Sequence, residues 1–269
     1  MATQWGSPEL AEKIKQIEHA SGGALCLTAR ELKTGHAVRY HGDRRCKTAS
    51  VIKLPMLVHI AMAVGEGALS WNEALTLTDA EKVAGSGVLT QLGAGLSLTL
   101  RDACVLMTIV SDNTATNMLI ERLGVAPVNE RMRSLGLPLT TLFRKSYTPD
   151  TEASREFGLG MTTPDEMADL VQMIAEERTG GPGVSAEILS ILGGQCLRDS
   201  IPRGLPPDWK YSGKTGGIDG VRNDVALVTS PEGARFVLAL FCQELKDLQW
   251  TPDNAGVVAL GNVTRTLLA

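Results

Sequence analysis

A serine and a lysine near the start of the chain have the residue types and the spacing for nucleophilic chemistry. Ser50 and Lys53 occupy positions i and i+3 at the start of an apolar run, so their side chains share a face if the run is helical. A serine hydroxyl becomes a strong nucleophile when a neighbouring base takes its proton, and burial or nearby cations make a lysine such a base. Many helices contain a Ser-x-x-Lys by chance, so the pair gains meaning only from other motifs.

Two later motifs offer the remaining polar groups that an acyl-transfer site needs. Ser111-Asp112-Asn113 lies at an expected break between two helices and supplies a hydroxyl, a carboxylate and an amide. Lys214-Thr215-Gly216-Gly217 lies at the end of an expected strand. Each is weak alone, because Ser-Asp-Asn is also a common helix cap or turn. The three motifs together, in this order, form a strong signal.

The elements that must position these motifs follow from hydrophobic periodicity and end signals. The middle of the chain is predicted to be helical, with helices over 51–65, 99–109, 113–123, 126–135, 163–177 and 185–192. The two ends are predicted to carry helices over 7–20 and 251–268 and strands over 24–29, 37–40, 209–216, 224–229 and 234–241. The economical fold is one sheet built from both ends of the chain, with a helical domain inserted. We expect an α/β domain from 1–49 and 196–269, an all-α domain from 50–195, and the site at their junction.

Composition excludes several function classes. The 269 residues are 43% hydrophobic and 21% charged with a net charge of −4, which is ordinary for a globular protein and gives no reason to expect nucleic acid as a partner. No apolar run approaches the ~20 residues of a membrane span. The segment Met1–Pro8 does not read as a secretory signal. The compartment stays open: periplasmic or secreted if a signal was removed, otherwise cytoplasmic. We expect a monomer that binds a small molecule.

Cysteines and histidines indicate neither a metal nor another cofactor. The five cysteines are widely spaced without a C-x-x-C, and the four histidines show no metal-ligand spacing. Cys26, Cys104 and Cys242 lie in apolar runs, and we expect them to be buried free thiols that pack as small hydrophobic residues.

The three motifs resemble those of the penicilloyl-serine transferase superfamily, and the class A β-lactamases most closely. The order Ser-x-x-Lys, Ser-Asp-Asn, Lys-Thr-Gly is a signature of that group, and the resemblance extends over essentially the whole chain. It implies a three-layer α/β fold, in which a five-stranded antiparallel sheet is flanked by helices and carries an inserted all-α domain. Many class A enzymes have a disulfide between the first two motif helices. Cys104 occupies one of its positions but Leu57 the other, so we expect that disulfide to be absent.

The resemblance implies a role for each site residue. Ser50 would attack an amide carbonyl, and Lys53 would take its proton, directly or through water; which group acts as the acylation base is disputed in class A enzymes. The backbone amides of Ser50 and Gly217 would form the oxyanion hole. Ser111 would pass a proton to the departing nitrogen.

Four further residues are expected to bind substrate. Asn113 would bind the side-chain amide of the substrate, Lys214 would hold Ser111 and the substrate carboxylate, and Thr215 would donate a hydroxyl to that carboxylate. Arg222 could reach the same anion, where with Lys53 and Lys214 it would form a cationic cluster that lowers the pKa of Lys53. An ordinary salt bridge is the alternative for Arg222.

One part of the class A pattern is missing. Those enzymes carry a loop Glu-x-x-Leu-Asn whose glutamate activates the water that releases the acyl group, and the loop over 144–161 has no such motif. An alignment on Pro149 puts Thr148 at the position of that glutamate. Glu152 is our first choice for a displaced base, ahead of Glu156 and Asp150, and solvated loop charges are the alternative.

The sequence therefore predicts a serine hydrolase that forms an acyl-enzyme on Ser50 with β-lactams and hydrolyses it with uncertain speed. Loss of a general base typically costs about 10²–10⁴-fold in rate. Two alternatives remain open: a D-Ala-type peptidase or esterase, and a protein that binds β-lactams covalently and releases them slowly.

Overall fold

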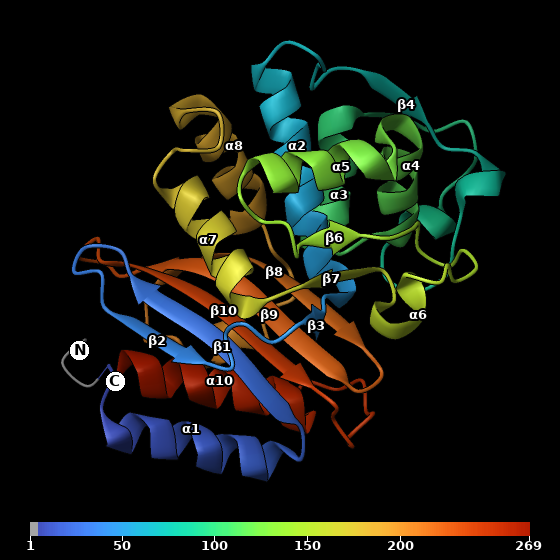
Figure 1. Ribbon diagram of the computed structural model, residues 1–269. Helices are drawn as coiled ribbons and strands as arrows, with labels where there is room; N and C mark the ends of the chain where they lie inside the picture. Colours follow the sequence, from blue (N-terminus) through green and yellow to red (C-terminus); the bar gives the residue numbers. More distant parts are fainter. Residues whose placement is uncertain (1–4) are drawn as a thin grey trace.

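The protein, described here from a computed structural model over residues 5–269, is built on one antiparallel sheet (Figure 1). Its order is β2-β1-β10-β9-β8. These strands are β1 (Ala24–Glu31), β2 (Ala37–Tyr40), β8 (Lys210–Ile218), β9 (Val221–Thr229) and β10 (Arg235–Gln243). Because β1 pairs with β10 along its whole length, the two ends of the chain form one sheet. The expected five-stranded antiparallel sheet is confirmed.

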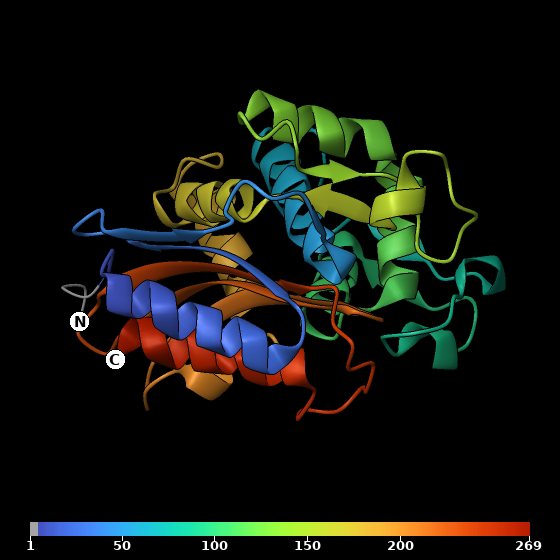
Figure 2. The ribbon, with the colours of Figure 1, turned by 60° about the horizontal axis from the view of Figure 1, so that its bottom comes forward.

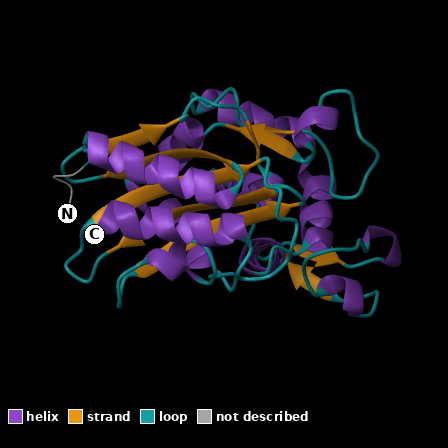
Figure 3. Ribbon diagram, turned by 90° about the horizontal axis from the view of Figure 1, so that it is seen from below, coloured by secondary structure: helices purple, strands orange, loops and turns teal. Residues whose placement is uncertain are grey.

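Helices cover both faces of the sheet. The terminal helices α1 (Pro8–Ser21) and α10 (Ala255–Leu268) run side by side across one face (Figure 3). On the other face lie α7 (Pro164–Ala175) and α8 (Pro182–Gly193), which pack against strands of the sheet although they belong to the expected all-α segment. The two chain ends that the structure describes lie on the same side of the molecule (Figure 2). The segment Met1–Pro8 is described only from residue 5, so residues 1–4 of the expected non-signal segment lie outside the described residues.

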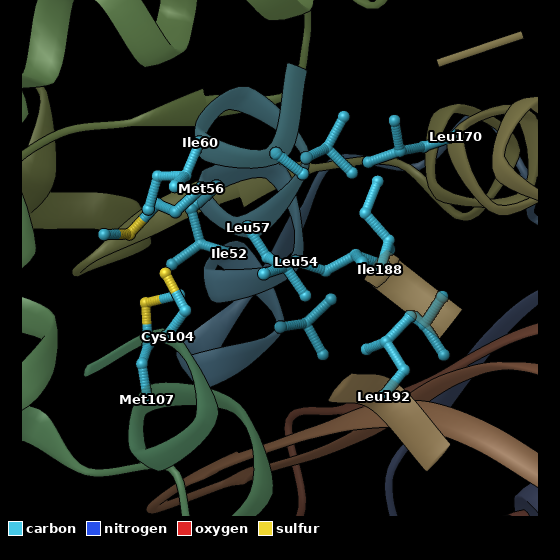
Figure 4. Packing of buried hydrophobic residues seen from close by; sticks show 14 of the residues in the cluster. Ile52, Leu54, Met56, Leu57, Ile60, Cys104, Met107, Leu170, Ile188 and Leu192 are labelled. Atoms are coloured by element: carbon cyan, nitrogen blue, oxygen red, sulfur yellow. The ribbon is translucent and has the colours of Figure 1, made fainter. Parts of the chain in front are cut away.

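Helix α2 (Lys53–Gly65) is buried over nearly its whole length, with α3 (Leu100–Ile109), α5 (Val125–Ser134) and α8 packed against it. Helix α4 (Asn113–Leu123) packs on α3, while the short α6 (Ser154–Phe157) and α9 (Ile201–Gly204) lie against β7 (Gly160–Thr162) and α10, respectively. Residues Lys53 to Ala63 are all buried, as expected for a helix that is apolar on every side. Figure 4 shows Leu57 and Leu54 pointing toward Ile188, while Cys104 lies on the side of Ile52 and Met56. The helix that follows Ser50 is thus the centre of the larger core.

Helix ends follow local chemistry. Ser7 caps α1 through a hydrogen bond from the Leu10 amide (3.2 Å), and Thr163 caps α7 through one from the Glu166 amide (3.1 Å), as the sequence predicts. The last helix begins at Ala255 rather than at Thr251, because the buried Asn254 side chain accepts the Gly256 amide (3.0 Å) and so ends the preceding loop.

Several short strands were not expected from the sequence. They form two small sheets: β3 (Cys46–Lys47), β7 (Gly160–Thr162) and β6 (Thr141–Leu142) in one, and β4 (Ala74–Thr76) with β5 (Ser97–Thr99) in the other. Strands of two or three residues carry no readable periodicity. The first of these sheets matters for function, because β3 leads directly into the segment that holds Ser50.

The five cysteines are free thiols. Cys26, Cys104 and Cys242 are buried, as the sequence predicts, and Cys46 is buried as well. Within residues 5–269 no helix is both long enough and apolar enough to cross a membrane.

Truncation of Leu57 is predicted to destabilise the fold. Leu57 is 0% exposed at the centre of the larger core, so Leu57→Ala leaves a cavity and is expected to lower the free energy of unfolding by about 2–5 kcal/mol. Denaturant unfolding measures the change. The control is Leu248→Ala, at a side chain that is 52% exposed, which should change stability by less than about 0.5 kcal/mol; equal effects would contradict the prediction.

Candidate active site

Ser50 lies on a short 3-10 helix, Ala49–Ile52, that is fixed from both sides. On one side, the Thr48 hydroxyl donates to the Gly160 carbonyl in β7 (2.8 Å). On the other, the Asn223 side-chain amide in β9 donates to the carbonyls of Lys47 (2.9 Å) and Thr48 (3.1 Å). Sequence reasoning missed Asn223 and Thr48, because neither belongs to one of the three motifs.

The side chain of Lys53 joins the first motif to the second. Lys53 is the first residue of α2 and is 0% exposed. Its Nζ contacts the carbonyl oxygen of Ser111 (2.7 Å), the Ser111 Oγ (3.1 Å) and the Asn113 Oδ1 (2.9 Å). A neutral amine has two hydrogens and one lone pair, so it can donate to two of these oxygens and accept a proton from a hydroxyl.

The side chain of Lys214 joins the third motif to the same hydroxyl. Its Nζ, also fully buried, lies 3.2 Å from Ser111 Oγ and donates to the Thr215 carbonyl (2.7 Å). The Ser111 hydroxyl therefore sits between two lysine amines. The structure thus brings Lys53, Ser111 and Lys214 together, and it places Ser50 on the 3-10 helix just before Lys53 and on the wall of a pocket that Asn113 also lines.

Burial sets the protonation state of the two lysines. Burial, and next the charge of Lys214, hold the pKa of Lys53 well below its usual range, and Asp112 opposes this shift. Burial lowers the pKa of Lys214 to about 7, opposed by the carboxylate of Asp224. A neutral Lys53 beside a cationic Lys214 is the arrangement that lets one amine act as a base and the other as a fixed charge.

The edge strand β8 touches the nucleophile segment through a glycine that the sequence analysis did not single out. A Cβ on Gly216 would lie 2.6 Å from the Thr48 carbonyl oxygen and 3.0 Å from the Ser50 nitrogen, so a side chain there is excluded. This contact sets the backbone of β8 directly against Ser50. Gly217, the next residue, lines the catalytic pocket, a cavity of about 1080 Å³ whose wall also includes Ser50, and a Cβ on Gly217 would lie 3.5 Å from the ring of Trp250.

Asp112 positions the middle motif. Its carboxylate is 1% exposed and accepts the amides of Val88 (2.6 Å), Leu89 (2.9 Å) and Ala115 (2.9 Å). It thereby caps α4 and ties the preceding loop to the site. Asn113 lines the catalytic pocket, and its Nδ2 donates to the Ala84 carbonyl (3.2 Å).

The loop that should carry a deacylation base presents no acidic side chain to the catalytic pocket. Thr148 and Pro149 line the pocket, whereas Glu152 is exposed and is not among the described residues that form its wall. Arg144 fixes this conformation through an ion pair with Asp150 (2.8 Å) and a hydrogen bond to the Thr148 carbonyl (2.8 Å). The structure therefore does not bring Glu152 to Ser50.

Arg222 also departs from its expected place. Its guanidinium donates to the carbonyls of Ile218 (2.7 Å), Val221 (2.8 Å) and Gln249 (2.7 Å), rather than forming a salt bridge. It lies under the ring of Trp250 and is not among the causes of the lowered Lys53 pKa. Lys53 and Lys214 thus meet at Ser111 without Arg222.

Within residues 5–269 no group of three or more His, Cys, Asp or Glu side chains could hold a metal ion. Thr215, half-buried next to Lys214, remains the expected hydroxyl donor of the third motif.

Removal of the Asp224 charge is predicted to shift the pH dependence of Ser50 acylation. Asp224 is 0% exposed, with its pKa raised to about 6 by burial, and it accepts the Tyr211 hydroxyl (2.7 Å). Its charge favours the cation of Lys214, which is present below about pH 7 and lost as the pH rises. Asp224→Asn should therefore move the alkaline limb of the acylation profile to lower pH. Tyr211→Phe keeps the carboxylate but removes a hydrogen bond that lowers the pKa of Asp224, so it should shift the limb in the same direction by less; an unchanged profile in Asp224→Asn would contradict a charge effect.

The sequence of this chain is similar to those of known β-lactamases. The model of the family described as the β-lactamase enzyme family matches residues 9–269. The chain is 29% identical over 253 residues to a β-lactamase of Streptomyces albus G, covering 87% of this chain and 77% of that protein. A β-lactamase of Proteus vulgaris is 27% identical, with 91% of each chain covered.

Solved structures agree with the sequence comparison. A β-lactamase from Sphaerobacter thermophilus superposes with a TM-score of 0.87 at 35% identity, covering 96% of this chain and 95% of that one. A point mutant of PBP-A, solved as an acyl-enzyme with penicillin G, superposes with a TM-score of 0.84 at 27% identity, again over 96% and 95%. The family match and the shared fold, together with the two lysines that meet at Ser111, lead to one conclusion: this chain belongs to the β-lactamase enzyme family.

Proposed function

We propose that the protein is a serine hydrolase that opens β-lactams through an acyl-enzyme on Ser50 and releases the product slowly. The observation that carries the proposal is the position of the Ser111 hydroxyl, 3.1 Å from Lys53 Nζ and 3.2 Å from Lys214 Nζ, beside the catalytic pocket that Ser50 lines. A buried neutral amine is a base at neutral pH, and a hydroxyl between two amines can relay a proton.

The proposed acylation combines Ser50, on the wall of the catalytic pocket, with the two lysine amines that meet at Ser111. Lys53 takes the proton of Ser50 as its Oγ bonds to the lactam carbonyl carbon, and the amides of Ser50 and Gly217 stabilise the resulting oxyanion. The carbon–nitrogen bond then breaks. Ser111 gives its proton to the departing nitrogen and recovers one from the protonated Lys53, so the protons balance. Lys214 and Thr215 hold the substrate carboxylate, and Asn113 orients its side-chain amide.

Deacylation lacks an evident carboxylate base. Among the described residues that line the catalytic pocket, the one acidic residue is Asp219, on the turn after β8, and it accepts a hydrogen bond from Trp250 (3.1 Å). The loop contributes Thr148 where a carboxylate is expected. Lys53 then remains as the base for the hydrolytic water, at a rate lower by about 10²–10⁴-fold than with a dedicated base.

The lack of a carboxylate base for deacylation favours a second candidate function. The free Ser50 can attack an ester or a D-Ala peptide in place of a β-lactam, and when water releases the acyl group slowly an amine can take it from Ser50 instead, which describes a D-Ala-type peptidase or esterase. This candidate shares every acylation step with the first, and only the preferred substrate differs.

Mass spectrometry of the intact protein tests the proposed acyl-enzyme. Incubation with penicillin G should add the mass of the whole antibiotic, because the leaving nitrogen stays tethered to the acyl group after the ring opens, and the adduct should persist for many turnover times of an efficient enzyme. Ser50→Ala should show no adduct. An adduct on Ser50→Ala, or none on the unaltered protein, would overturn the assignment of the nucleophile.

Two variants of the loop test the deacylation step. Thr148→Glu places a carboxylate on the wall of the catalytic pocket and should speed loss of the penicillin G adduct by about tenfold or more. Glu152→Gln, at an exposed side chain outside the pocket wall, should leave the rate unchanged. A large slowing in Glu152→Gln would instead identify Glu152 as the base, as the sequence predicts.

A further inference from the structure

An exposed tryptophan stands on the wall of the catalytic pocket without a role in the acylation steps. The side chain of Trp250, on the segment between β10 and α10, is 66% exposed and lines the same cavity as Ser50. Ile218, at the end of β8, is 39% exposed and lines that cavity as well. Exposed apolar surface gathered in a concave site is typical of ligand-binding positions.

The ring of Trp250 is fixed in place before any ligand arrives. Its Nε1 donates to Asp219 Oδ1 (3.1 Å), and the guanidinium of Arg222 lies 4.4 Å from the ring centroid. Arg222 is itself held by three backbone carbonyls. A platform supported by a hydrogen bond and a cation–π contact loses little freedom when a ligand binds, so more of the contact energy appears as affinity.

The ring also lies beside Gly217, the residue whose amide is proposed to bind the oxyanion. A Cβ on Gly217 would come within 3.5 Å of the Trp250 ring, so the ring is beside the oxyanion residue. The departing nitrogen must face Ser111 and Lys214. In the proposed binding mode the acyl part of the substrate extends the other way along β8, from Gly217 toward Ile218 and Asp219, where Trp250 lies.

We propose that Trp250 is a specificity-determining residue that binds an aromatic or bulky apolar group at the end of the substrate's acyl side chain. This inference rests on the proposed function, because it assumes that the acyl group is transferred to Ser50. A flat, fixed indole favours a ring that stacks on it or meets it edge-on, over a small or charged substituent. Arg222 and Asp219 act through Trp250 as positioning residues.

A matched pair of substrates tests the proposal. Benzylpenicillin and 6-acetamidopenicillanic acid share the bicyclic ring, the carboxylate and the side-chain amide, and differ only in the phenyl group. The second-order rate constant for Ser50 acylation is measured for both by intact-protein mass spectrometry. Trp250→Ala should lower it about tenfold for benzylpenicillin and less than about twofold for the acetamido compound. Trp250→Phe should retain most of the preference, since it keeps a ring.

The control is Leu248→Ala, because Leu248 belongs to the same segment, is 52% exposed and is not among the described residues that line the catalytic pocket; it should change neither rate. An equal loss on both substrates in Trp250→Ala would show that the ring only supports the edge strand, and no loss on either would show that it does not touch substrate. Both results would overturn the proposal. Absence of acylation by both substrates in the unaltered protein would instead refute the proposed function.

Discussion

The structure depends on two buried lysines that share one serine hydroxyl. Lys53 and Lys214 are both 0% exposed, and their amines approach Ser111 Oγ from a helix and from a strand. Two buried cations at such a place would repel each other and lose their hydration. The fold accommodates them because oxygen acceptors surround each amine and because one amine can be neutral. Burial therefore lowers the pKa of Lys53 and makes its amine a base.

The rest of the fold keeps these groups in register. The helix that begins at Lys53 is buried on all sides, so it cannot rotate without disturbing the larger core. Gly216 lets the edge strand lie directly against the backbone of Ser50, and Asn223 ties the neighbouring strand to the residues just before it. A site assembled from one helix, one inter-helix turn and one strand is as precise as the packing between them.

The structure provides more of the groups proposed for acylation than of those proposed for deacylation. Lys53, Ser111 and Lys214 are buried and meet one another, whereas the loop over 144–161 has Thr148 on the wall of the pocket and Glu152 exposed to solvent. Arg144 forms an ion pair with Asp150 and donates a hydrogen bond to the Thr148 carbonyl, and these contacts hold the loop in this conformation. Under the proposed mechanism, this loop sets how fast water releases the acyl group from Ser50.

The sequence by itself determined the family, the sheet built from both chain ends and the three motifs, because short-range spacing and hydrophobic periodicity are local properties of the chain. It also placed Ser50 and Lys53 on one helical segment. Only the tertiary structure decided that Arg222 supports Trp250 instead of joining the lysines, that Glu152 faces solvent and that Gly216 and Asn223 align the nucleophile. These outcomes depend on contacts between residues far apart in the chain, where the direction of a side chain is set by packing that no local pattern records.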